Sequence, residues 1–140
     1  LVEKHGKSLY YLMEQEEGKN VFFIHGGISA EDRESVRELC ERTDNNIIVA
    51  SYGTFSTGIN IKNLNNVVFA SPSKSRIRNL QSIGRGLRRT DRKTKVVLID
   101  IVDDLTIGKY MNYTFRHHLE RVKIYHSEKF NILKSYVHSI

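Results

Sequence analysis

The chain has 140 residues, of which 39% are hydrophobic and 27% are charged, with a formal net charge of +6 at pH 7. This composition is typical of one soluble domain, and no apolar run approaches the roughly 20 residues that span a bilayer. The single cysteine, Cys40, cannot form an internal disulfide and has no partners at zinc-ligand spacing. We therefore expect an intracellular, reducing setting, no membrane segment and no metal bound by cysteine.

The basic residues are unevenly distributed. Residues 74–95 carry nine Lys and Arg against one acid, residues 105–140 carry six against two, and the rest of the chain is net acidic. A basic patch on an otherwise acidic domain indicates a polyanionic partner, nucleic acid or nucleotide. A solvated basic surface is the alternative, and charge alone does not decide between the two.

Short apolar runs alternate with helical patterns along the chain. Leu1 and Val2 have the character of a strand end, and because Leu1 is not a natural initiator we expect a fragment or processed product. Helices are predicted at Ser8–Glu17, at Ala30–Arg42 behind a Ser29 N-cap, and at Ile77–Leu87. The predicted strands are Val21–Ile24, Ile47–Ala50, Val67–Ala70 and Val96–Ile99.

Nearly continuous apolar strands indicate burial on both faces, which is typical of a parallel sheet between helices. We therefore predict an α/β fold with repeated βα units. After Asp104 the chain becomes basic and rich in tyrosine, with a helix expected at about 112–126. Its tyrosines are expected to pack in a core, with base stacking as the alternative. Cys40 is expected in the core, and His117 and His118 at the surface.

The most informative run is Leu80–Arg89. If it is helical, Gln81, Gly84, Arg85 and Arg88 follow the spacing i, i+3, i+4, i+7 and share one face. A guanidinium group offers a fork of donors that fits phosphate oxygens, and glycine allows close approach to the backbone. The run therefore predicts a phosphate-binding face.

A complete ATPase site is not expected within these residues. His5-Gly6-Lys7-Ser8 is similar to the end of a P-loop, but the glycine required five residues before Gly6 is replaced by Leu1. Asp103 and Asp104 follow a predicted strand, but no phosphate-binding loop accompanies them, so they are not expected to form the Mg²⁺ site of an ATPase.

Two other segments follow predicted strands. Residues 50–60 are rich in hydroxyl groups and glycine, and His25-Gly26-Gly27 precedes a helix. Amides and hydroxyls at the carboxyl ends of strands bind phosphate or ribose in many α/β proteins. A polar turn without a ligand is the alternative for each segment, and it is the stronger interpretation at Gly26 and Gly27.

Together, Gly58-Ile59-Asn60-Ile61 and Gln81-x-x-Gly84-Arg85-Gly86-x-Arg88 resemble motifs V and VI of superfamily 2 helicases. Their order, spacing and intervening strand all match. The resemblance implies that residues 1–104 form the second RecA-like domain. That domain would be a three-layer α/β/α fold with a mainly parallel sheet and a truncated first strand. Residues 105–140 would form a basic, aromatic-rich helical extension packed on it.

In that family the first RecA-like domain holds most of the ATP and Mg²⁺ site, and the second contributes arginines. The resemblance implies that Arg88 is the arginine finger on the γ-phosphate, Arg85 its phosphate-binding neighbour, and Gln81 the group that positions water or phosphate. Gly58, Asn60 and Gly84 would complete the nucleotide contacts. Asn60 replaces the family's usual aspartate, so charge pairing there is not expected.

Nucleic-acid contacts are also implied by the resemblance. The expected residues are Gly26, Gly27, Lys74, Arg76 and either Ser51 or Thr54, which align ambiguously with the motif V threonine. The implied function is an ATP-dependent helicase that remodels branched DNA or RNA–DNA hybrids in recombination, replication and repair. Its partners would be nucleic acid and the N-terminal RecA-like domain, without which this chain would be inactive. The alternatives are a non-catalytic nucleic-acid-binding or annealing module and a purely structural interaction domain.

Overall fold

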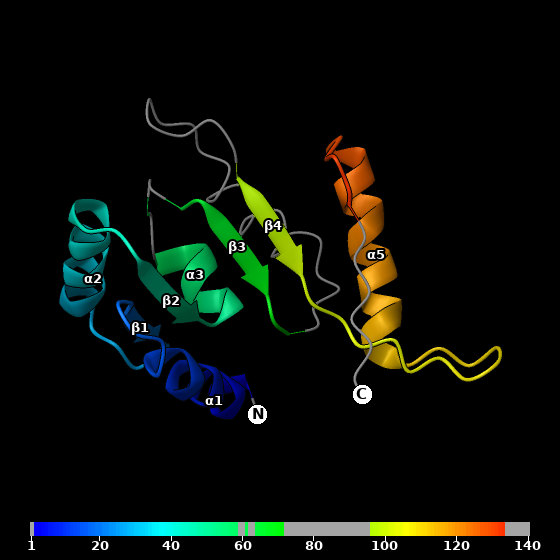
Figure 1. The fold of residues 1–140 in the computed structure, drawn as a ribbon, viewed down its shortest axis with the longest axis horizontal. Coiled ribbons are helices and arrows are strands. Elements are labelled where there is room, and N and C mark those ends of the chain that lie inside the picture. The colour runs from blue at the N-terminus through cyan, green and yellow to red at the C-terminus, as the bar shows by residue number, and fades with distance from the viewer. Residues whose placement is uncertain (1, 59–60, 62–63, 72–95, 134–140) are drawn as a thin grey trace.

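The computed structural model describes residues 2–58, 61, 64–71 and 96–133 (Figure 1). Helices and strands alternate along most of these residues, as the sequence predicts. The helices are α1 (Val2–Glu14), α2 (Ala30–Arg42), α3 (Tyr52–Gly58) and α5 (Tyr113–Ser127), and the strands are β1 (Asn20–Ile24), β2 (Asn46–Ala50), β3 (Asn66–Phe69) and β4 (Val97–Asp100). The helix expected at 77–87 lies outside the described residues.

The strand pairings in the described part of the chain are parallel. β1 pairs with β2, ending with Ile24 opposite Ala50, and β3 pairs with β4, ending with Phe69 opposite Asp100. Among the described residues these pairs form two separate two-stranded sheets. Parallel neighbours need a crossover connection, which α2 supplies between β1 and β2. The predicted α/β class with parallel strands is confirmed.

The helix α2 begins and ends where the sequence predicts. Ser29 is its N-cap, and the Ser29 Oγ accepts a hydrogen bond from the Asp32 amide at 3.0 Å. Cys40 lies on the buried face of α2 and forms the first core cluster with Ile24 and Ile61. Its expected place in the core is therefore confirmed.

The short helix α3 lies between the two strand pairs (Figure 1). Its Phe55 packs against the first core cluster. Its Tyr52 packs against a second core cluster, which is centred on Phe69 and Tyr125. The sequence predicted a phosphate- or ribose-binding segment here, with a polar turn as the alternative, and no helix; the structure shows a helix that packs against both clusters.

The helix α5 runs beside β4 (Figure 1), and its first residue is within one residue of the prediction. Its N-cap, Asn112, fastens the preceding loop with its side chain. The Nδ2 of Asn112 donates to the Asp103 carbonyl at 2.9 Å, and its Oδ1 accepts from the Leu105 amide at 3.1 Å. The loop that leaves β4 is thus anchored to the start of α5.

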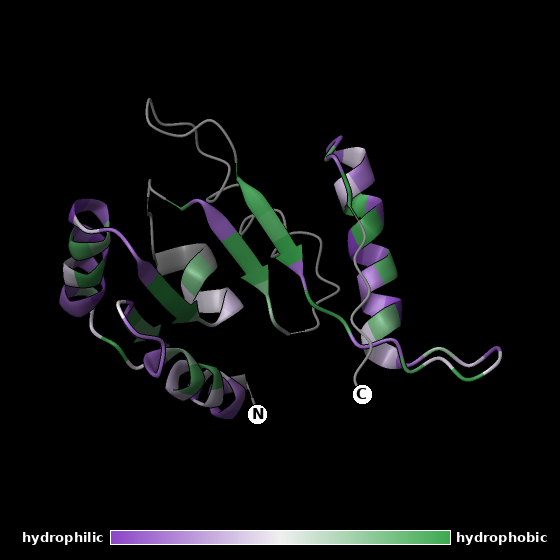
Figure 2. Cartoon of the chain, viewed as in Figure 1, coloured by the Kyte–Doolittle hydropathy of each residue, from purple (hydrophilic) through white to green (hydrophobic). Residues whose placement is uncertain are grey.

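The strands β3 and β4 bury only one face. Phe69 and Leu98 belong to the second core cluster, whereas Val68, Val97 and Ile99 are 48%, 40% and 45% exposed. Successive side chains of a strand point to opposite faces, so a packing layer on one side leaves the other uncovered. The predicted burial on both faces is therefore not seen among the described residues of this pair, although both strands are largely hydrophobic (Figure 2).

The N-terminal residues also differ from the prediction. Val2 begins α1 and is not the end of a truncated strand. Contacts four residues apart stabilise this first part of the helix: Ser8 Oγ donates to the Lys4 carbonyl at 3.1 Å, and Lys7 pairs with Glu3 at 3.8 Å. The apolar pattern that predicted Ser8–Glu17 therefore identified the second half of a longer helix.

Candidate functional site

The carboxyl ends of β1 and β2 lie at the same edge of their sheet. Ile24 and Ala50 are paired in register, so the turn after β1 and the start of α3 are neighbours. This edge is where α/β proteins usually bind phosphate-containing ligands. It brings Gly26 and Gly27 to the same edge of the sheet as Ser51.

Two backbone groups in the turn after β1 already form hydrogen bonds to nearby side chains. The Gly27 amide donates to His25 Nδ1 at 3.2 Å, and the Gly26 carbonyl accepts from Arg33 Nη2 at 3.3 Å. A Cβ added at Gly27 would lie 3.2 Å from the His25 ring, whereas one at Gly26 would meet nothing within 4 Å. The expected nucleic-acid contacts at these glycines stay predictions, with Gly26 the more open of the two.

The start of α3 joins the two alternative motif V hydroxyls. Ser51 Oγ lies 2.8 Å from Thr54 Oγ1 and accepts a hydrogen bond from the Thr54 amide at 3.3 Å. Thr54 is only 7% exposed, while Ser51 is half-buried. The structure thus leaves Ser51 more accessible to a nucleic-acid backbone, with Thr54 behind it as its hydrogen-bond partner.

Two helices attach to the residues that follow β3. His5 of α1 donates from its Nε2 to the Ala70 carbonyl at 3.0 Å. Tyr52 of α3 donates from its hydroxyl to the Ser71 carbonyl at 3.0 Å. Ser71 is the last described residue before 72–95, the segment that contains the predicted motif VI residues.

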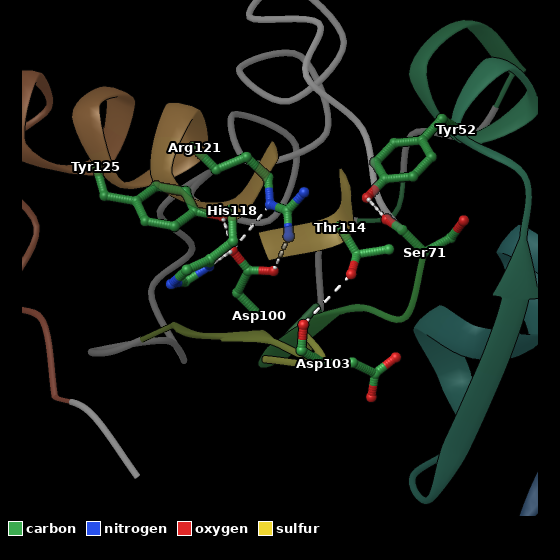
Figure 3. A network of polar contacts seen from close by, with 8 residues as sticks. All are labelled: Tyr52, Ser71, Asp100, Asp103, Thr114, His118, Arg121 and Tyr125. Carbon is green, nitrogen blue, oxygen red and sulfur yellow. Dashed lines mark hydrogen bonds and ion pairs between the residues drawn. The ribbon is translucent and has the colours of Figure 1, made fainter. Parts of the chain in front are cut away.

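The end of β4 carries a buried polar network (Figure 3). The Asp100 Oδ2 accepts hydrogen bonds from Arg121 Nε at 2.9 Å, Tyr125 hydroxyl at 2.8 Å and His118 Nδ1 at 3.1 Å. The Asp100 Oδ1 accepts from Arg121 Nη2 at 2.7 Å. The Arg121 side chain is 0% exposed and that of Asp100 is 8% exposed. A buried charge requires such pairing, and here the pair joins α5 to β4.

The network fixes the protonation states of its donors. Burial lowers the pKa of Arg121, but the hydrogen bonds and charge of Asp100 outweigh this and leave that pKa above its ordinary value. Burial, together with the charge of Asp100, raises the pKa of Tyr125. Arg121 is therefore a cation and Tyr125 a neutral donor at physiological pH.

Sequence reasoning missed this network. It predicted His117 and His118 at the surface, yet His117 is buried and His118 contacts Asp100. A signal was present, because His118, Arg121 and Tyr125 follow the spacing i, i+3, i+7 and so share one face of a helix. An acid at the end of a buried strand is the partner such a face requires.

Most predicted nucleotide contacts lie outside the described residues. These are Asn60, Gln81, Gly84, Arg85 and Arg88. Two of the predicted nucleic-acid contacts, Lys74 and Arg76, also lie outside the described residues. Gly58 is the last residue of α3. Among the described helices, none has both the length and the apolar character needed to cross a membrane. Nor do the described His, Cys, Asp and Glu residues gather into a group of three that could hold a metal ion.

Comparison with known proteins identifies the family. Residues 2–90 match the family described as the helicase conserved C-terminal domain. The chain belongs to this family. The predicted resemblance to helicases is thereby confirmed, and the helicase C-terminal domain assigned here covers most of the parallel strands.

One relative is close in sequence. The chain is 41% identical over 137 residues to the ATP-dependent DNA helicase uvsW of Enterobacteria phage T4, covering 91% of this chain and 27% of the phage protein. The chain thus spans about a quarter of the length of that relative. A solved structure, the C-terminal part of the Fun30 ATPase domain, matches with a TM-score of 0.55 at 13% identity, covering 89% of this chain and 45% of that one. That second likeness concerns the fold of this helicase domain.

Proposed function

We propose that this helicase domain is the C-terminal RecA-like lobe of an ATP-dependent DNA helicase and works against a P-loop lobe. The observation that carries the proposal is the 41% identity to a phage T4 protein named as an ATP-dependent DNA helicase. We assign residues 1–104 to the lobe and residues 105–140 to an extension packed on it. The contact between Arg121 and Asp100 supports that packing.

The proposed chemistry is divided between the two lobes. ATP and Mg²⁺ are assigned mainly to the P-loop lobe, because the present sequence lacks the first glycine of a P-loop. Arg88 would stabilise negative charge on the γ-phosphate, with Arg85 binding phosphate beside it and Gln81 positioning water or phosphate. An arginine supplied across an interface accelerates phosphoryl transfer by about 10³- to 10⁵-fold.

The nucleic-acid contacts are proposed for the carboxyl edge of the strands. Ser51 is half-buried at this edge, to which the open Gly26 also belongs. Lys74 and Arg76 belong to the basic segment 74–95, whose charge favours a phosphate backbone. Branched DNA or RNA–DNA hybrids in recombination, replication and repair are the proposed substrates.

A chimera tests this proposal. The aligned 27% of the phage T4 helicase would be replaced by this chain, and ATP hydrolysis would be measured with and without branched DNA. We expect DNA-stimulated hydrolysis, with the unmodified phage protein as the positive control. A soluble chimera that binds DNA but never hydrolyses ATP would contradict the motor assignment.

The alternatives predict different binding behaviour for the chain by itself. An annealing module binds DNA and accelerates strand pairing without ATP, whereas a structural domain shows no salt-dependent DNA binding. Phosphate contacts predict an affinity that falls steeply as salt concentration rises. DNA binding with such a salt dependence would count against the structural domain. ATP-independent strand pairing, together with an inactive chimera, would favour the annealing module.

A further inference from the structure

The tyrosines that follow β4 lie in two opposite environments. Tyr125 is 5% exposed and belongs to the second core cluster, as the sequence predicts. Tyr110 and Tyr113, in contrast, are 75% and 59% exposed. Leu105 and Ile107 lie just before them and are 68% and 79% exposed. Large apolar side chains that gather at the surface of one segment indicate an interaction site.

These exposed residues belong to a short, anchored hairpin. The backbones of Ile107 and Tyr110 exchange two hydrogen bonds of 3.0 Å, and Gly108 lies in the turn between them with a φ of 58°. Nearer the base, Asp104 Oδ1 accepts a hydrogen bond from the Thr106 amide at 3.1 Å. The hairpin projects away from the strands beside the start of α5 (Figure 1). A loop ordered in advance loses little conformational entropy when a partner binds.

A basic side chain accompanies each exposed ring. The Lys109 Nζ lies 5.9 Å from the centroid of the Tyr110 ring, within the range of a cation–π contact. Arg116 is exposed and follows Tyr113 by three residues in α5, so the two are neighbours on the helix surface. We call Lys109, Tyr110, Tyr113 and Arg116 the tyrosine surface. Aromatic rings interleaved with cations are typical of proteins that bind single-stranded nucleic acid.

We propose that the tyrosine surface is a further nucleic-acid-binding site, on which unpaired bases of single-stranded DNA stack against Tyr110 and Tyr113. This inference rests on the proposed function, because helicase action exposes unpaired bases. The Cα atoms of the two tyrosines are at most about 11 Å apart, so one strand reaches both rings. The cation beside each ring favours a polyanion over an apolar protein surface.

The test is the affinity of the chimera with the phage T4 helicase for an oligonucleotide of thymidines, measured by fluorescence anisotropy without ATP. Tyr110→Ala and Tyr113→Ala should each weaken binding about fivefold or more, the effect of losing one stacked base. Tyr110→Phe keeps the ring and should bind like the parent. Tyr11→Ala is the matched control, because Tyr11 is also 59% exposed but lies on α1. It should leave the affinity unchanged.

An abasic oligonucleotide of the same length separates stacking from a merely structural role of the ring. It keeps the phosphates and removes the bases, so the parent chimera and Tyr110→Ala should bind it equally. If Tyr110→Ala weakens binding of the abasic and thymidine strands alike, stacking at this ring is overturned. An unchanged affinity of both alanine variants for the thymidine strand would also overturn the inference, and would leave the exposed rings as a contact for protein.

Arg88→Ala separates this inference from the proposed function. If Arg88→Ala leaves ATP hydrolysis by the chimera intact, the proposed function itself fails. If Arg88→Ala abolishes hydrolysis while Tyr110→Ala and Tyr113→Ala bind the thymidine strand like the parent, only the tyrosine surface is overturned.

Discussion

Arg121 of α5 donates two hydrogen bonds to Asp100 at the end of β4, at 2.9 and 2.7 Å, and its side chain has no exposed surface. The two residues are 21 positions apart in the sequence, so the pair fixes a tertiary contact. Through it α5 is joined to β4.

Replacing Arg121 should destabilise the chain strongly. Arg121→Met leaves the Asp100 carboxylate buried without its cation, and breaking a buried pair in this way costs about 3–5 kcal/mol. The free energy of unfolding, measured by urea denaturation, reports the loss. Arg42→Met is the matched control in α2, because Arg42 is largely exposed and lies 3.7 Å from Glu38. It should change stability by less than about 1 kcal/mol.

The double variant refines this prediction. Asp100→Asn combined with Arg121→Met removes both charges, so it should be more stable than Arg121→Met alone. A double variant that is less stable than the single one would mean that the buried charge is not the source of the loss.

The hydroxyl of Tyr125 should also contribute measurably to the stability of the fold. Tyr125→Phe removes a 2.8 Å hydrogen bond to a charged acceptor, which is worth about 1.5–3 kcal/mol. Tyr113→Phe, at an exposed position of the same helix, should have almost no effect. Equal thermal unfolding midpoints for the two variants would contradict the role of the Tyr125 hydroxyl.

Stability should decline in alkaline solution because of the buried tyrosines. Burial is the main cause that raises the pKa of Tyr52 to about 12, and it also raises that of Tyr125. An unfolded tyrosine has a pKa of about 10, so the stabilisation is complete below that pH and is lost as the pH rises toward 12. Across this pH window, the free energy of unfolding measured in urea should therefore decline less steeply for Tyr52→Phe than for the parent chain. If the unfolding free energies of the two proteins fall in parallel as the pH rises, folding does not raise the pKa of Tyr52.

Two open glycines should respond oppositely to substitution by alanine. Gly18 has a φ of 72°, a conformation that costs an alanine roughly 1–2 kcal/mol. Gly53 lies inside α3, where alanine is favoured over glycine by about 0.5–1 kcal/mol. A Cβ meets nothing within 4 Å at either position. Unfolding free energies should thus fall for Gly18→Ala and rise for Gly53→Ala, and changes of the same sign would contradict the backbone argument.

Much of the fold is predictable from local patterns. The four apolar runs locate all four described strands within about one residue, the uncertainty usual for element ends. Ser29 predicts the start of α2 because its side chain caps the helix locally. Cys40 is predictable as core because it lies on the apolar face of that helix.

The incorrect predictions concern residues whose structure depends on tertiary contacts. Residues 52–58 are rich in glycine and hydroxyl groups, yet Tyr52 and Phe55 pack into two clusters and hold a helix there. His118 is polar by type, and its spacing with Arg121 and Tyr125 indicates a shared helix face, but the acid that this face contacts lies 18 positions away in the sequence. The nucleotide contacts depend on residues outside the described structure and on the motif resemblance, so their roles stay predictions.

Arg88 is proposed to complete an ATP site held by another lobe. The most direct measurement is the turnover rate for DNA-stimulated ATP hydrolysis by the chimera carrying Arg88→Ala, beside Arg89→Ala as the neighbouring control. We predict a loss of about 10³-fold or more for Arg88→Ala, with DNA binding retained, and a small effect for Arg89→Ala. Equal turnover in the two variants would contradict the claim.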